Sequence, residues 1–304
     1  MLTSTRTIIS VVFAVLAAIA SGMSLLTQHQ ANVSLDHSDA LTSEGHVSRL
    51  HRGLDLLRDP IWLIGTVFLS LTFVLGAMAL YFGQLVVVQP IFVLELVVTL
   101  LLRRLWLHDR IATKTWLAAA VLCVGLTGFL VTANPQDTSN GTSALRWTTV
   151  VLAWSAIVCV LLLIARRGSD VRRAAMYGAA ASVVWSIDAA FVKAATLVLK
   201  ATGWSGMFVH WPLYALVATG ILGELMVQSA LHAGPLSASQ PAMLIVEPLA
   251  GILVGIQVFG EHLRSSPLAI SGEILFLATM VLGVLFITRW APPRLSPRVL
   301  KREL

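Results

Sequence analysis

The stretch ALHAGPLSASQP occupies residues 230–241, and a second stretch, ALYFGQLVVVQP at residues 79–90, repeats its pattern. Both copies read A-L-x-x-G-x-L-x-x-x-Q-P, so six positions match at a constant separation of 151 residues. A repeat at this distance predicts two similar half-structures, because each copy must occupy an equivalent place in its own half. Glycine permits a tight reversal and proline suits a helix start, so each copy predicts a hairpin between two membrane-spanning helices.

The composition indicates that the bilayer is the solvent. Of the 304 residues, 57% are apolar and only 12% are charged, and the mean hydropathy is +0.84. Soluble domains carry roughly 25% charged residues. The net charge is +6, but the basic residues lie between apolar runs, as in membrane loops, which argues against nucleic acid as a partner. The predicted partner is the lipid bilayer.

Nine apolar runs are long enough to cross about 30 Å of hydrocarbon. They cover residues 7–27, 60–81, 85–102, 115–133, 147–165, 174–199, 209–231, 238–259 and 267–288. The predicted fold class is therefore an all-α polytopic membrane protein with about nine transmembrane helices. Residues 1–133 form the first membrane half, residues 134–173 a connecting region with a central helix, and residues 174–288 the second half. Residues 289–304 form a basic cytoplasmic tail, and the odd central helix inverts the second four-helix repeat.

The distribution of Lys and Arg predicts the orientation. With the C-terminus in the cytoplasm and the N-terminus outside, sixteen basic residues fall in inner segments and four in outer segments. This placement is expected in a plasma or inner membrane. An alternative treats residues 6–20 as a cleaved secretory signal, but cleavage would leave eight spans and place residues 103–114 and 166–173 outside, against the charge rule.

The segment from residue 28 to residue 59 is the one sizeable polar piece and is predicted to be a cytoplasmic loop. It contains His29, His37, His46 and His51, whose spacing matches no compact ligand set, so the sequence does not decide whether it binds metal. Leucines and valine at helical spacing in residues 47–57 predict an amphipathic helix on the inner membrane surface.

Ionisable residues inside the predicted spans mark the candidate site. Glu95, Asp188, Glu224 and Glu247 lie within spans, and Lys193 is the only opposing charge there. Each ionised carboxylate at mid-bilayer costs about 2.5–3.5 kcal/mol, so these residues predict an internal polar cavity. Asp188 points away from the polar face of its own helix, which carries Lys193, and is not expected to line that cavity.

Glu247 and Glu224 are the principal candidates for binding a solute or a coupling ion. Supporting polar contacts are expected from Glu95, Lys193, Gln240, Gln89 and Gln228. Pro90, Pro241 and Pro248 are expected to break or kink their helices. Gly251 and Gly255 have G-x-x-x-G spacing and predict close helix packing.

The same residues were also compared with what other classes of protein function require. Polar residues between transmembrane helices can serve only in packing, so a non-transporting membrane scaffold stays an alternative. The sequence has no nucleotide-binding loop, metalloprotease motif or nucleophile elbow, and an enzyme is not expected. No cofactor and no metal site are predicted; the free cysteines Cys123 and Cys159 lie in apolar runs.

The second copy of the repeat, the span containing Glu247-Pro248, FGEHL at residues 259–263 and a final glycine-containing span together resemble the EamA-type repeat of the drug/metabolite transporter superfamily. In the first half WLHDR, at residues 106–110, falls where FGEHL does and lacks the glutamate. The resemblance implies two inverted halves and transport of a small solute. Members usually have ten helices, whereas the pattern here is four, one and four.

Nine spans with an external N-terminus are similar to the NIPA-like magnesium-transporter branch, which makes a divalent cation an alternative substrate. The resemblance thus implies a secondary transporter that moves a small metabolite or drug-like solute by alternating access, coupled to protons or another ion. The sequence names neither the solute, the direction of transport nor the coupling ion. It is compatible with a homodimer and does not determine the oligomeric state.

Overall fold

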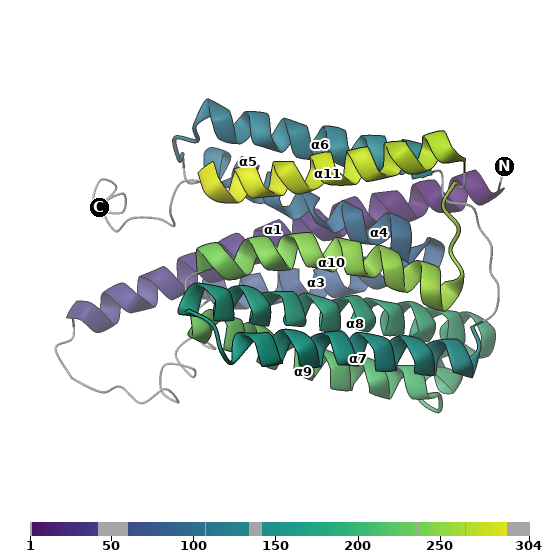
Figure 1. Ribbon diagram of the computed structural model, residues 1–304. Coiled ribbons are helices and arrows are strands. Elements are labelled where there is room, and N and C mark those ends of the chain that lie inside the picture. Colours follow the sequence, from purple (N-terminus) through teal and green to yellow (C-terminus); the bar gives the residue numbers. More distant parts are fainter. Residues whose placement is uncertain are drawn as a thin grey trace. The chain divides into compact units, whose positions relative to one another are not determined.

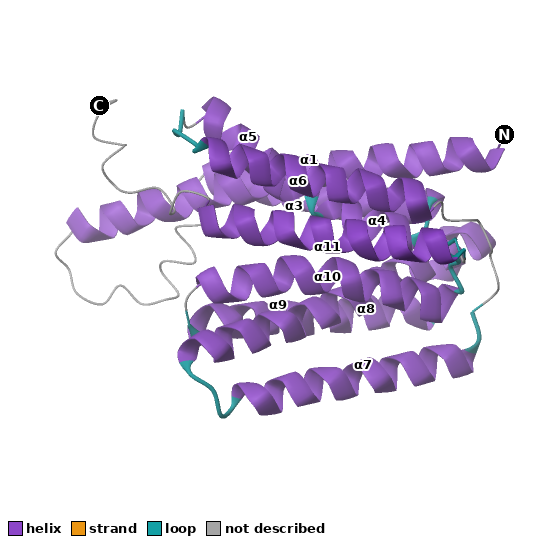
Figure 2. Ribbon diagram, turned by 45° about the horizontal axis from the view of Figure 1, so that its top comes forward, coloured by secondary structure: helices purple, strands orange, loops and turns teal. Residues whose placement is uncertain are grey.

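The computed structural model describes residues 2–41, 60–106, 108–133, 142–234, 236–264 and 266–290. Within these ranges the regular elements are helices, with no β-strand among them (Figure 2). They are α1 (Leu2–Leu41), α3 (Pro60–Phe82), α4 (Leu85–Phe92), α5 (Leu94–Trp106), α6 (Thr113–Ala133), α7 (Ala144–Ala165), α8 (Asp170–Met207), α9 (Trp211–Ala233), α10 (Leu236–Phe259) and α11 (Pro267–Trp290).

Nine segments of the described chain are long and apolar enough to cross a membrane, with 21 to 38 residues each. Each of the nine predicted spans overlaps one of them, and α4 with α5 together make the third. Large apolar side chains are exposed on their outer faces; for example, Val67 on α3 and Ile221 on α9 are 67% and 60% exposed. Such faces are stable only against lipid. The prediction of an all-α polytopic membrane protein is confirmed.

The chain forms two compact units. The first contains residues 1–83 and 91–109, and therefore α1, α3 and α5; the second contains residues 84–90 and 110–304. The second unit thus includes α4 up to Pro90, and also α6, which the sequence analysis assigned to the first membrane half. The inverted relation of the two predicted halves stays a prediction.

In the first unit, α1 packs against both α3 and α5. Ser10 and Ser24 on α1 donate hydrogen bonds to the carbonyl oxygens of Ala79 and Gly65 on α3, each at 2.9 Å. Gly22 of α1 faces α5, where an added Cβ would lie 3.2 Å from the Cβ of Val98. Hydroxyl bonds and close backbone approach hold helices together where lipid removes the hydrophobic driving force.

In the second unit, α8 is the central helix and packs against α7, α9 and α10 (Figure 1). Ser182 and Ser186 on α8 donate hydrogen bonds to the carbonyl oxygens of Met243 and Glu247 on α10, at 3.1 and 2.9 Å. Helix α8 leaves helical geometry only near its end, at Gly203, where φ is 73°.

Helices α6 and α11 form the other main pair of the second unit. Glycines set their spacing: a Cβ at Gly283 would lie 2.6 Å from the backbone nitrogen of Leu122, and one at Gly125 would lie 2.8 Å from the Cα of Met280. The two helices therefore touch through their backbones, which larger side chains would prevent.

Both copies of the repeated motif form helix–turn–helix junctions, as predicted. In the first copy α3 ends at Phe82 and α4 begins at Leu85; in the second α9 ends at Ala233 and α10 begins at Leu236. A Cβ at Gly83 would overlap the hydroxyl of Ser10 on α1, and a Cβ at Gly234 would overlap the backbone carbonyl of Asp170 on α8. The shared glycine is thus needed in both copies because the first helix of each predicted repeat passes close to it.

The three prolines predicted to break or kink their helices lie in different surroundings. The third span is interrupted at Val93, three residues after Pro90. Helix α10 continues from Leu236 to Phe259 through Pro241 and Pro248, so neither proline interrupts it, and a kink at these positions stays a prediction.

The predicted loop of residues 28–59 is helical over its first part, because α1 continues to Leu41. No glycine or proline occurs from Gln28 to Leu41, so nothing in that sequence ends the helix. The predicted surface helix near residues 47–57, with His46 and His51, lies outside the described residues, as does the tail after Trp290.

Replacing Gly234 with alanine is expected to destabilise the protein by about 1–3 kcal/mol, because the backbone of Asp170 cannot yield without moving α8. The matched control is Gly220→Ala in α9, the helix that ends just before Gly234, where the nearest atom is Asp188 Oδ1 at 3.7 Å. That change should be neutral or stabilising by up to about 1 kcal/mol. Apparent melting temperatures of the purified variants in detergent measure both effects, and equal shifts would contradict the close approach at Gly234.

Candidate functional site

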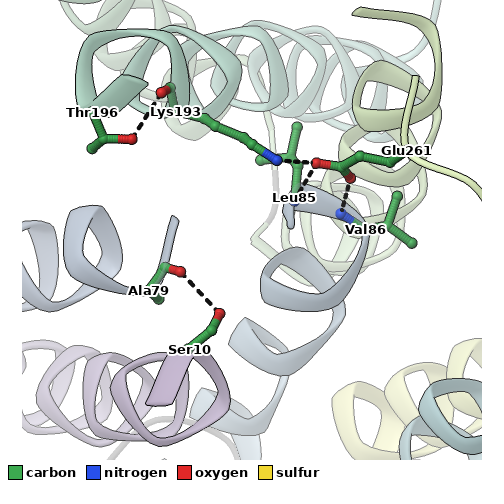
Figure 3. Close-up of polar contacts among 7 residues, drawn as sticks. All are labelled: Ser10, Ala79, Leu85, Val86, Lys193, Thr196 and Glu261. Atoms are coloured by element: carbon green, nitrogen blue, oxygen red, sulfur yellow. Dashed lines mark hydrogen bonds and ion pairs between the residues drawn. The ribbon is translucent and has the colours of Figure 1, made fainter. Parts of the chain in front are cut away.

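Lys193 lies on α8 in the interior of the second unit and is buried there. Its ammonium group contacts the carboxylate of Glu261, and the pair is almost fully shielded from solvent (Figure 3). The same ammonium lies 4.7 Å from the centroid of the Phe259 ring, within range of a cation–π contact. Lys193, the only lysine or arginine in the predicted spans, is therefore paired with an acid.

Glu261 lies in the short connection between α10 and α11, directly after Gly260. The φ of Gly260 is 63°, in the left-handed region that favours glycine. The carboxylate accepts hydrogen bonds from two backbone amides: Leu85 N lies 2.9 Å from Oε1, and Val86 N lies 2.8 Å from Oε2 (Figure 3). The first amides of a helix lack intrahelical partners and carry partial positive charge, so Glu261 caps the start of α4.

Helix α4 lies along two glycines of α10. A Cβ at Gly255 would lie 3.2 Å from the Cβ of Leu85, and a Cβ at Gly251 would lie 2.9 Å from the Cβ of Gln89. The prediction that the G-x-x-x-G pair permits close helix packing is confirmed. Gln89 is 2% exposed, and its Oε1 has no hydrogen-bond partner among the described residues.

Aromatic rings surround the ion pair on one side. Trp147 of α7 stacks on Phe191 of α8 at a centroid distance of 5.0 Å, and it meets Trp211 and Phe259 edge-on at 5.2 and 5.9 Å. This apolar shell excludes water, which strengthens the attraction between Lys193 and Glu261 and raises the cost of removing either partner alone.

The acid that pairs with Lys193 is not one of the predicted site acids. Glu224 is exposed on α9 and accepts a hydrogen bond of 2.8 Å from Gln228, one turn further along the same helix. Glu95 belongs to the first unit, where Ser21 donates to its Oε2 at 2.5 Å. Glu247 is half-buried on α10, and Gln240 is exposed near the start of that helix.

Asp188 faces α9, as expected of a residue pointing away from the polar face that carries Lys193. Its Oδ1 accepts a hydrogen bond of 2.7 Å from Thr219, whereas Ser182 and Ser186 of the same helix point to α10. Within the described ranges, no three His, Cys, Asp or Glu side chains converge as a group that could hold a metal ion.

Glu261 is the site residue that the sequence analysis missed. Glu261 follows the predicted span 238–259 by two residues, so it lies outside the apolar runs that contain the other candidate acids. A usable signal was present: FGEHL contains an acid directly after a long apolar run, and WLHDR in the first half has no glutamate at that place. A lysine in a span without an opposite charge nearby in the sequence predicts that an acid pairs with it, and that acid can lie just beyond the end of another span.

The ion pair predicts a specific pattern of stabilities. Lys193→Met or Glu261→Gln alone should destabilise the protein by about 3–5 kcal/mol, because each leaves a buried charge or donor without its partner. The double variant should be less destabilised than the two single effects added, since no lone charge remains. Apparent melting temperatures in detergent would be compared with Arg173→Met, which removes a largely exposed ion pair to Asp170 and should change little. Strict additivity would contradict the pairing.

Comparison with known proteins supplies a relative but no function. The chain is 28% identical over 257 residues to an uncharacterized protein of Corynebacterium glutamicum, a match covering 84% of this chain and 86% of the relative. No family model matches the chain. No solved structure matches it either. The similarity covers most of the length of both proteins.

Proposed function

We propose that the protein is a secondary transporter of the drug/metabolite transporter type, which moves a small solute across the plasma membrane by alternating access. The main observation that supports the proposal is the ion pair between Lys193 and Glu261. The spans contain further acids, at Glu95, Glu224 and Glu247, and their only lysine is held by an acid outside the spans. Retaining these costly groups favours a role for them with a proton or a cationic solute.

The interrupted third span supports the same proposal. Secondary transporters bind solutes and coupling ions at discontinuous helices, where backbone groups are not used within the helix. Here the interruption at Val93 separates α4 from α5, and the start of α4 receives a carboxylate. A scaffold has no need of an interruption within a span.

The polar face of α9 suggests where water would enter. Glu224 and Gln228 are exposed on the second unit, and His232 follows one turn later, bonded through Nδ1 to the carbonyl of Gln228 at 2.7 Å. An ionised Glu224 against lipid would cost about 2.5–3.5 kcal/mol, a cost that an aqueous path along this face removes. We assign Glu224 and Glu247 to the coupling proton or the cationic solute, with Gln89, Gln228 and Gln240 as polar contacts.

A flux screen on purified protein in lipid vesicles tests the proposal. An imposed pH gradient should drive uptake of at least one small solute, and Glu247→Gln should reduce gradient-driven flux by at least about tenfold, the effect of losing about 1.4 kcal/mol in the transition state. Glu273→Gln, which neutralises a buried acid on α11 given no role here, is the matched control and should retain flux.

A separate arm offers magnesium without any organic solute. Uptake of the ion alone, weakened by Glu247→Gln, would assign the protein to magnesium transport instead of proton-coupled solute transport. Absence of any flux across the screen, with folded protein in the vesicles, would favour the scaffold and overturn the proposed function.

A further inference from the structure

We propose that Glu261 is a positioning residue, which holds α4 in the register that places Gln89 against Gly251. The inference rests on the proposed function in one respect, namely that Gln89 is a solute contact. The anchoring of α4 itself is argued from the contacts within the second unit.

Helix α4 depends on such an anchor because its own sequence attaches it weakly. It has only eight residues, and non-helical residues precede and follow it, at Gly83–Gln84 and at Val93. The chain enters the second unit at Gln84 and leaves it after Pro90. A segment this short is marginal as a helix by itself, so its place is set by what it contacts in that unit.

The cap of α4 comes from a distant part of the chain. Gln84 stands at the N-cap position, where Ser, Thr, Asp or Asn would supply a short acceptor. The acceptor is instead Glu261, which is 176 and 175 residues away from the two amides that it binds. Bonds from an ionised acceptor are about twice as strong as neutral ones, so the carboxylate is a strong attachment for the end of α4.

The attachment also sets the register of α4 on α10. Leu85 and Gln89 are one turn apart on α4, and they meet Gly255 and Gly251, one turn apart on α10. A slip by one helical turn would bring Gln89 opposite Gly255 and separate Glu261 from its two amides. Holding the first turn therefore determines that the unpartnered Oε1 of Gln89 lies at Gly251, where a solute donor could bind it.

Lys193 completes the anchor by balancing the charge of Glu261 from α8. The carboxylate thus joins the start of α4 to the central helix of the unit as well as to the end of α10.

Thiol labelling measures this anchoring without any transport assay. The native cysteines are removed (Cys123→Ala and Cys159→Ala), Gln89→Cys is introduced, and the full-length protein is treated with a charged maleimide. Labelling should be slow with Glu261 present and at least about tenfold faster with Glu261→Gln, because an amide has one acceptor atom for the three donors that the carboxylate serves. Glu273→Gln should leave the rate unchanged.

Val284→Cys on α11, a position that is 1% exposed, reports general loosening. Faster labelling at position 89 alone supports the inference. An unchanged rate at 89, or an equal increase at 89 and 284, overturns it. If Gln89→Cys does not fold, Val88→Cys on the same helix, fully buried in the native protein, gives the same comparison.

The two proposals can fail separately. If Glu261→Gln speeds labelling at position 89 but the protein transports no solute in the flux screen, the result contradicts the proposed transport function and supports the anchoring of α4. If the protein transports a solute but Glu261→Gln labels at position 89 as slowly as the protein with Glu261, the positioning role of Glu261 is wrong and the proposed transport function stands.

Discussion

One buried carboxylate joins parts of the second unit that lie far apart in the sequence. Glu261 follows α10, receives the ammonium of Lys193 from α8, and accepts the first two amides of α4. Withdrawing a carboxylate and an ammonium from water is costly, and only good geometry with further hydrogen bonds repays that cost. The arrangement supplies both, and for this reason the three segments must keep their relative places.

The packing around this cluster depends on residues that are small. Gly251 and Gly255 allow α4 to lie against α10, and Gly125 and Gly283 allow backbone contact between α6 and α11. In a bilayer, apolar side chains gain little by facing each other instead of lipid, so close approach and hydroxyl-to-carbonyl bonds must hold the helices. The serines of α1 and α8 supply such bonds in their respective units.

These features connect naturally with the proposed transport function. The interrupted third span begins with a helix that is capped by a remote acid and carries Gln89, whose buried Oε1 has no hydrogen-bond partner among the described residues. Such a helix is suited to binding and releasing a solute. The exposed Glu224 and Gln228 on α9 supply a polar face that lipid would not tolerate when the acid is ionised.

Sequence alone determined the number and approximate limits of the membrane helices, because apolar length is a local property. It also determined where one helix ends and the next begins at each copy of the repeat, since the repeated glycine and the helix starts are encoded locally. It could not find the partner of Lys193, because a contact across 68 residues depends on how α8 and α10 pack. It likewise could not tell that α10 runs uninterrupted through Pro241 and Pro248. Tertiary structure decided these points, since pairing and packing arise between segments and leave no periodic signal in any one of them.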